Sequence, residues 1–237
     1  MTPTSTGRAV LVQTAYGPML VPPYDEYVAQ SLIRTGVFSS AEWDGWVPYL
    51  SADAVVWEVG ANIGAHTLAF ASTCRTVEAW EPQLALYRML CGSLALGGGR
   101  NVTLHNAAVG TAQTVSVPQL DVSAPANFGG VAMGHGSVDV PCVPLPTGPC
   151  DFLKIDVEGA ELDVLATLQK DTRPVIVAEA DRPGQLDAVS AWLRDRGYVV
   201  GVQRAPLGPL WPKIISLNVV GVPSERPWVD APHIVKL

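Results

Sequence analysis

The chain has 237 residues, of which 48% are hydrophobic and 16% charged, which excludes a disordered protein and indicates one sizeable domain with a buried core. The formal net charge is −7 and the 15 basic residues are scattered, so we expect no nucleic-acid partner, because phosphate backbones bind clustered Lys and Arg. Four cysteines without C-x-x-C spacing argue against a zinc site and a disulfide framework. The first residues, Met1–Arg8, lack the apolar stretch of a signal peptide and no apolar run could cross a bilayer, so we expect a cytoplasmic protein.

Residues 1–49 are expected to form an N-terminal extension or cap, ahead of a main domain at 50–237. Ala9–Gln13 and Pro18–Val21 have the pattern of a short hairpin. A helix is expected to follow and to end at Gly36, since glycine favours the left-handed conformation that ends many helices.

The main domain alternates short apolar strands with amphipathic helices. The expected strands are Ala54–Val59, Thr76–Trp80, Val102–His105, Phe152–Val157, Val175–Glu179, Tyr198–Gln203 and Ile214–Val220. The expected helices that lie between them are Ala65–Ser72, Leu84–Gly97, Glu161–Leu168 and one around Leu186–Leu193. This alternation predicts an α/β fold with a Rossmann-like, doubly wound, seven-stranded sheet that is mostly parallel and has its last strand antiparallel. The irregular segment at 110–150 is expected to cover the site, because long loops in compact domains are usually functional.

Two strands end in acidic residues and then break at glycine, which is how an open parallel sheet forms a ligand crevice. In the first of these turns Glu58 precedes Gly60, and Asn62 stands where a dinucleotide-binding motif would have its second glycine. A pyrophosphate is therefore disfavoured there. Glu81 ends the next strand, where an acidic residue can accept hydrogen bonds from a ribose; the alternative is a surface carboxylate at a helix start.

The second acidic turn, "LKIDVEGAE", places Lys154 and Asp156 on the same face of a strand. If its neighbours are the strands that end at Glu58 and Glu179, one cation and several carboxylates share a crevice, as in functional sites and in structural ion pairs alike. Asp156, Glu158 and His135 are the candidate general bases, although His135 could also be an ordinary loop histidine. Carboxylates here could hold magnesium, but the spacing does not require it, so we expect metal-free catalysis.

The sequence resembles the FkbM family of class I S-adenosylmethionine-dependent methyltransferases. The matching blocks are "YDEYVAQSLIRTGVFSSAEW", "VWEVGANIGAHTLAFA", "VEAWEP", "LHNAAVG", "NFGG", "DFLKIDVEGAELDVL" and "VIVAEAD". There are two departures: Glu58 replaces the usual Asp of the family, and "VPLPTGPC" replaces an acidic stretch before the fourth strand.

The resemblance implies a cofactor site for S-adenosylmethionine. Gly60, Ala61 and Asn62 would line the methionine moiety, Glu81 would hold the ribose, and Asn106 and Ala107 would flank the adenine. The full set of expected cofactor-binding residues is Glu58, Gly60, Ala61, Asn62, Gly64, Glu81, Pro82, Asn106, Ala107 and Asp156, the last beside the transferred methyl group. The residues expected to contact substrate are Asn127, Phe128, Gly129 and Glu179.

The expected function is therefore methyl transfer to a hydroxyl of a small molecule, in natural-product or glycan biosynthesis. A nicotinamide-dependent oxidoreductase on a similar sheet is one alternative, which the non-glycine at Asn62 and the lack of a Tyr-x-x-x-Lys pair oppose. A catalytically inactive binding module of the same fold is another. Fold and function are separate claims. The sequence identifies neither the acceptor nor the oligomeric state.

Overall fold

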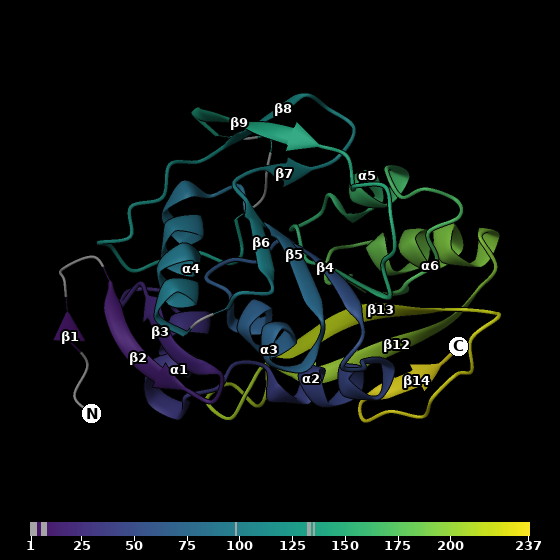
Figure 1. Ribbon diagram of the computed structural model, residues 1–237, viewed down its shortest axis with the longest axis horizontal. Coiled ribbons are helices and arrows are strands. Elements are labelled where there is room, and N and C mark those ends of the chain that lie inside the picture. Colours follow the sequence, from purple (N-terminus) through teal and green to yellow (C-terminus); the bar gives the residue numbers. More distant parts are fainter. Residues whose placement is uncertain (1–3, 6–8, 98, 132–133, 135) are drawn as a thin grey trace.

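The computed structural model describes residues 4–5, 9–97, 99–131, 134 and 136–237. The strands of its central sheet are β4 (Val55–Val59), β5 (Thr76–Trp80), β6 (Val102–His105), β10 (Phe152–Ile155), β11 (Val175–Glu179), β12 (Tyr198–Pro206), β13 (Ile215–Pro223) and β14 (Ile234–Lys236). They are arranged in the order β14-β12-β13-β11-β10-β4-β5-β6 (Figure 1).

The five strands β6, β5, β4, β10 and β11 run parallel, so their carboxyl ends meet at one edge of the sheet. In this register Lys154 of β10 lies opposite Glu58 of β4 and Val177 of β11. The order β5-β4-β10-β11 contains the switch point, because β4 is followed in the chain by β5 on one side and paired with β10 on the other. A ligand crevice is expected at such a point.

The predicted mostly parallel α/β sheet is confirmed, but the expected count of seven strands is wrong. The additional strand is β14, which pairs antiparallel with β12 from Gly201 to Gln203. Its three residues are too few to show a strand periodicity in the sequence. This segment becomes a strand because it pairs with the free edge of β12 in the folded sheet.

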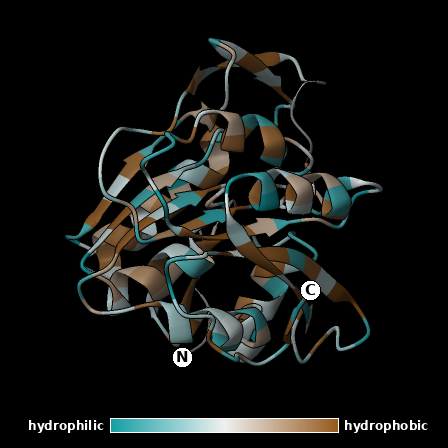
Figure 2. Cartoon of the chain, turned by 90° about the vertical axis from the view of Figure 1, so that its right-hand side faces the viewer, coloured by the Kyte–Doolittle hydropathy of each residue, from teal (hydrophilic) through white to brown (hydrophobic). Residues whose placement is uncertain are grey.

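Helices cover both faces of the sheet and form two hydrophobic cores, and hydrophobic residues run along the central strands (brown in Figure 2). The helices are α1 (Val28–Thr35), α2 (Ser40–Trp46), α3 (Ala65–Thr73), α4 (Leu84–Gly97), α5 (Glu161–Ala166) and α6 (Gln185–Asp195). Neighbouring strand residues point to opposite faces: Phe152 joins the core of α3 and α4, and Leu153 joins the core of α5 and α6. Because both faces of these strands are buried, the strands are continuous apolar runs in the sequence.

The predicted hairpin is present as β2 (Val10–Thr14) and β3 (Gly17–Val21), with β1 (Thr4–Ser5) beside β2. The predicted helix end is also confirmed, since Gly36 has φ 74° and donates its N–H to Leu32. Met19 and Trp46 belong to the same core as the sheet residue Val56. The N-terminal segment is therefore packed onto the sheet rather than attached loosely to it.

The segment expected to cover the site contains β8 (Thr114–Val117) and β9 (Val138–Val143), which form a separate three-stranded sheet with β7 (Ala108–Val109) at the top of Figure 1. The helices and strands expected for the main domain are all present, with bounds that shift by a few residues. No helix in the described part of the chain combines the length and the hydropathy that a membrane span needs.

Candidate active site

A cavity of about 360 Å³ opens at the carboxyl ends of the central strands. Its wall combines residues from the sheet, the N-terminal segment and the segment between β8 and β9. The predicted site residues that line it are Gly60, Ala61, Asn62, Glu81, Pro82, Asn127, Phe128, Gly129, Asp156, Glu158 and Glu179. Residues separated by more than a hundred positions in the sequence therefore meet at one cavity.

Four predicted residues do not line this cavity. Glu58 is 1% exposed and lies behind the wall, where it accepts a hydrogen bond from the Thr67 hydroxyl at 2.6 Å. Gly64 packs against Leu90, and Ala107 is buried in the core of α5 and α6. The fourth is Asn106, whose side chain bonds the carbonyls of Glu81 and Pro82. His135 lies outside the described residues.

The loop after β4 depends on backbone conformations that favour glycine. Gly60 has φ 83°, and a Cβ atom added there would stand 1.8 Å from the carbonyl oxygen of Asp156. The N–H groups of Gly60 and Ala61 both donate to the Trp80 carbonyl, which ties this loop to the end of β5. Asn62 adopts φ 54°, a left-handed conformation that asparagine tolerates better than most residues. The backbone at position 60 passes so close to the end of β10 that only glycine fits there.

Glu81 connects the turns after β4 and β5. Its carboxylate accepts the N–H of Asn62 at 2.8 Å and the N–H of Gln83 at 2.7 Å. Burial is the main reason that the pKa of Glu81 rises to about 7. The Asn106 amide donates to the carbonyls of Glu81 and Pro82, so it fixes this turn from outside the cavity.

Lys154 is a buried cation between two carboxylates. Its Nζ lies 3.7 Å from Glu58 Oε1 and 3.2 Å from Asp156 Oδ2. Burial disfavours its charge, but Asp156 and Glu58 outweigh that effect and raise the pKa of Lys154. In Glu58 burial dominates and raises the pKa to about 7, although Lys154 opposes the shift. The buried ammonium group of Lys154 thus holds the partly exposed Asp156 carboxylate at the cavity.

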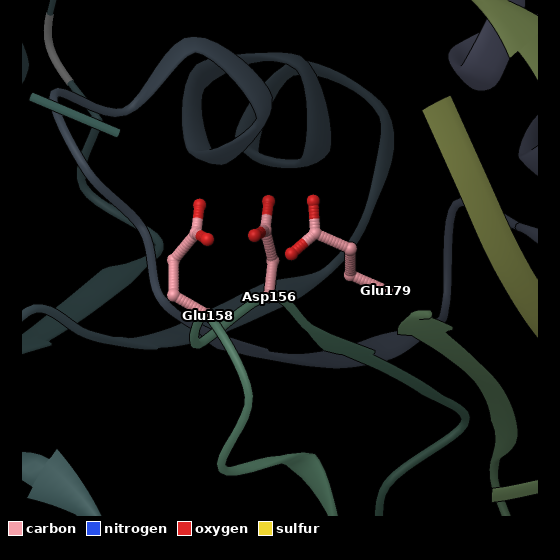
Figure 3. A group of neighbouring side chains, drawn as sticks. All are labelled: Asp156, Glu158 and Glu179. Carbon is pink, nitrogen blue, oxygen red and sulfur yellow. The ribbon is translucent and has the colours of Figure 1, made fainter. Parts of the chain in front are cut away.

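The carboxylates of Asp156, Glu158 and Glu179 face the same space from the ends of β10 and β11 (Figure 3). Each contributes an oxygen atom within 4.8 Å of the other two. Arg182 donates to Glu158 at 2.5 Å, yet burial and Asp156 still raise the pKa of Glu158 to about 7. Burial, with Asp156 and Glu158 nearby, raises the pKa of Glu179 to about 11. Glu179 is therefore protonated at neutral pH, which relieves the repulsion in the group.

These raised pKa values predict how stability depends on pH. Glu58, Glu81 and Glu158 have folded pKa values of about 7, above the ordinary 4.5, so the folded state binds more protons between these limits. The free energy of unfolding should be highest below the ordinary pKa and should fall as pH rises toward about 7. Thermal melts of the ligand-free protein should show a melting temperature that decreases over this range. Glu58→Gln should flatten the slope; an unchanged slope would contradict the assignment to Glu58.

A buried polar network forms the wall on the side of the N-terminal segment. Glu42 of α2 accepts hydrogen bonds from Asn218 at 2.7 Å and from the hydroxyls of Ser39 and Ser216. Gln203 accepts the indole N–H of Trp46 at 2.9 Å. Glu42, Ser216 and Asn218 all line the cavity. This wall offers oriented polar groups to a ligand that reaches beyond the strand ends.

Asp25 attaches the segment around Phe128 to the N-terminal segment. One carboxylate oxygen accepts the N–H of Phe128 at 3.0 Å and the other accepts the N–H of Ala29 at 2.7 Å. Phe128 is 3% exposed and contributes to the cavity wall. Gly129 approaches the Asn62 amide so closely that an added Cβ atom would stand 3.1 Å from it. The segment around Gly129 thus lies directly against the loop after β4.

Comparison with known proteins identifies the family of this chain. Residues 58–200 match the model of the methyltransferase FkbM domain, and no curated protein matches the sequence. The chain belongs to the FkbM methyltransferase family. The resemblance seen in the sequence is therefore confirmed, and with it membership of a family of S-adenosylmethionine-dependent methyltransferases.

Solved structures that resemble this FkbM-family chain support the fold. A methyltransferase FkbM from Methylobacillus flagellatus KT matches with a TM-score of 0.54 and 16% identity over 73% of this chain, which spans 44% of that protein. M. jannaschii TYW2, solved in complex with AdoMet, matches with a TM-score of 0.52 and 15% identity over 92% of this chain and 87% of its own. A precorrin-6y C5,15-methyltransferase from Geobacter metallireducens GS-15 matches with a TM-score of 0.50 and 16% identity over 84% and 94%.

The structure also places residues at the cavity that the sequence did not single out as ligand contacts. They are Tyr27, Phe38, Glu42, Trp46, His66, Gln83, Lys154, Ser216 and Asn218, among others. The family-like block "YDEYVAQSLIRTGVFSSAEW" was a signal for the first three. Ser216 and Asn218 carried no local signal, because they lie in an ordinary apolar strand.

Proposed function

We propose that this chain transfers the methyl group of S-adenosylmethionine to a hydroxyl of a small molecule, in natural-product or glycan biosynthesis. The proposal depends chiefly on one observation: a single cavity joins Glu81 and the loop after β4 to the carboxylates after β10 and β11. Glu81 and the loop after β4 suit a nucleoside with an amino-acid tail, and the carboxylates after β10 and β11 suit an uncharged acceptor. The net charge of −7 disfavours a nucleic-acid acceptor.

In this proposal the cofactor occupies the part of the cavity between β4 and β5. Gly60, Ala61 and Asn62 line the methionine moiety and the free lone pairs of Glu81 accept the ribose hydroxyls. Asn106 and Ala107 act on the adenine edge indirectly, because Asn106 fixes the turn at Pro82. Gly64 and Glu58 act on this loop from outside the cavity: Gly64 lies against Leu90, and Glu58 accepts a hydrogen bond from Thr67.

We expect S-adenosylmethionine and S-adenosylhomocysteine to bind and NAD not to bind. The loop carries Asn62 in place of the glycine that a pyrophosphate requires, and its backbone N–H groups at Gly60, Ala61 and Asn62 are already bonded to Trp80 and Glu81. Isothermal titration calorimetry of the purified protein measures both ligands. Micromolar binding of NAD, with no response to S-adenosylhomocysteine, would overturn the proposed cofactor.

Glu81→Ala should weaken binding of S-adenosylhomocysteine by about 1–3 kcal/mol, the cost of losing hydrogen bonds to a charged acceptor. The matched control is Glu78→Ala on β5, the strand that precedes Glu81, because Glu78 bonds His105 and lies outside the cavity wall. The control should bind with unchanged affinity. Equal losses in the two variants would mean that the effect comes from the strand and not from the ribose contact.

The acceptor is proposed to lie against Asn127, Phe128, Gly129 and Glu179, with the Glu42 network behind it. In this proposal the described part of the segment at 110–150 covers the acceptor, since closing excludes water and opening releases product. Residues 1–49 complete the wall as a cap. An acceptor with several hydroxyl groups suits the polar side chains of Ser216 and Asn218.

Phe128→Ala should raise the KM for the acceptor and leave cofactor affinity nearly unchanged, because the ring forms part of the proposed acceptor wall. Hydrogen exchange should show the cover more protected with acceptor and S-adenosylhomocysteine together than with S-adenosylhomocysteine alone. Equal exchange in every ligand state and normal kinetics for Phe128→Ala would assign acceptor recognition elsewhere, most directly to the segment from Tyr24 to Trp46.

The methyl acceptor can be sought directly. S-adenosylmethionine with a labelled methyl group is incubated with the protein and a small-molecule extract of the cells that carry the gene, and labelled products are separated by mass. A labelled ether supports the proposal. A labelled amine or ester would correct the acceptor group, and binding of cofactor without any transfer would favour the inactive binding module.

A further inference from the structure

His66 is a buried imidazole in the cavity wall that has no hydrogen-bond partner at Nε2 among the described residues. It is the second residue of α3 and follows directly on the loop proposed to hold the methionine moiety. Its side chain is 7% exposed. A buried polar atom without a partner is uncommon in folded proteins, and one in a cavity wall suggests that a ligand supplies the partner.

Aromatic side chains hold this imidazole in place. The Trp46 ring meets it edge-on, with centroids 4.8 Å apart, and the Phe38 ring lies at 5.8 Å. Both aromatic residues also line the cavity and come from the N-terminal segment. The ring is thus held by these aromatic contacts, and its Nε2 atom is left buried without a hydrogen-bond partner among the described residues.

The candidate carboxylate bases already have a proton or a cation. Asp156 is paired with Lys154 at 3.2 Å and Glu158 with Arg182 at 2.5 Å. The raised pKa of Glu179 keeps its carboxyl group protonated at neutral pH. Among these residues, His66 is the one that can accept a proton without first giving up an ionic partner.

We propose that His66 removes the proton of the acceptor hydroxyl during methyl transfer. The inference rests on the proposed function. As the O–H bond breaks, its proton moves to an imidazole nitrogen and the oxygen forms a bond to the methyl carbon. The bond from that carbon to sulfur breaks, and its electron pair stays on the neutral thioether of S-adenosylhomocysteine. The imidazolium then releases its proton to water, so atoms and charge balance.

The surroundings keep His66 ready for this role. Burial is the main cause and Lys154 the second cause of a pKa well below 6.5 for His66, so the ring is neutral at neutral pH. The buried ionisable groups on the surrounding elements are Lys154 of β10, Glu58 of β4 and Glu42 of α2. Glu58 and Asp156 offset the charge of Lys154, so the imidazolium can exist as a short-lived species.

The protonation state can be measured without knowing the acceptor. Nitrogen NMR of the full chain, labelled at histidine and saturated with S-adenosylhomocysteine, reports both ring nitrogens of each histidine. His66→Gln identifies the signal of His66, and His233→Asn, on the exposed tail, is the control. His66 should keep one unprotonated nitrogen below its ordinary pKa of 6.5. A His66 ring that is doubly protonated at neutral pH would overturn the proposal.

The catalytic role is tested with labelled S-adenosylmethionine and the same small-molecule extract. His66→Ala should lower methyl transfer about 100-fold, and added imidazole should restore part of it, whereas His66→Gln should stay inactive. Activity of the wild type should persist below pH 7, since Glu158 as base would lose it near its pKa of about 7. Normal transfer by His66→Ala would contradict the inference alone. A wild-type protein that binds no S-adenosylhomocysteine would instead contradict the proposed function.

Discussion

Asp156→Asn is expected to lower the rate of methyl transfer about 100-fold or more while the protein stays folded. Asp156 ends the central strand, lines the cavity and lies 3.2 Å from Lys154, so the substitution removes the charge that offsets this lysine beside the cationic cofactor. Asparagine has nearly the same shape and leaves the packing intact. The measurement is turnover at saturating S-adenosylmethionine, with circular dichroism to verify folding.

The companion variant Glu158→Gln should also lower turnover, and the matched control is Asp187→Asn on the exposed face of α6. Unchanged rates in both site variants would remove these carboxylates from the mechanism. A chelator should have little effect on the rate. A strict magnesium requirement would instead make metal ligands of Asp156, Glu158 and Glu179, whose oxygens are close enough to share an ion.

Gly60→Ala is expected to abolish cofactor binding and to destabilise the fold. The new Cβ atom would stand 1.8 Å from the Asp156 carbonyl oxygen, so the loop after β4 or the end of β10 must move. The positive φ of 83° adds about 1–2 kcal/mol of backbone strain, and forcing the two backbones apart adds about 1–3 kcal/mol more. Denaturant unfolding and calorimetry with S-adenosylhomocysteine measure the two effects.

Gly184→Ala separates the two causes. Gly184 has a similar φ of 78°, but nothing lies within 4 Å of the position of an added Cβ atom. This control should show only the strain and should bind cofactor normally. Equal destabilisation in the two variants would mean that the contact between the loop after β4 and the end of β10 is unimportant.

The order and type of the elements could be predicted because their signals are local. Strands buried on both faces, such as Phe152–Ile155, are continuous apolar runs, and Gly36 ends its helix through its own backbone freedom. Glu81, Asp156 and Glu179 could be placed together for a related reason. Parallel strands bring their carboxyl ends to one edge, so a residue that follows such a strand is assigned to that edge by the sequence.

Contacts between distant segments could not be predicted in this way. Glu58 and Asp156 each stand at the end of a buried strand and shortly before a glycine. In the structure, however, Glu58 lies behind the cavity wall and bonds Thr67, whereas Asp156 lines the cavity. Likewise His66 was not among the site residues predicted from the sequence. It lines the cavity because α2 packs Trp46 against it, a contact with no local signature.

By itself, then, the sequence determined the α/β sheet, the acidic turns and the family, because strand periodicity, glycine and short motifs act within a few residues of one another. Tertiary structure alone decided that β14 joins the sheet, since its three residues need the edge of β12 for hydrogen bonds. It also decided that Glu42 meets Asn218 across 176 positions and that Asp25 holds the backbone of Phe128. Side chains of this kind find partners only after the chain has folded, so burial and hydrogen bonding, rather than residue order, select the walls of the cavity.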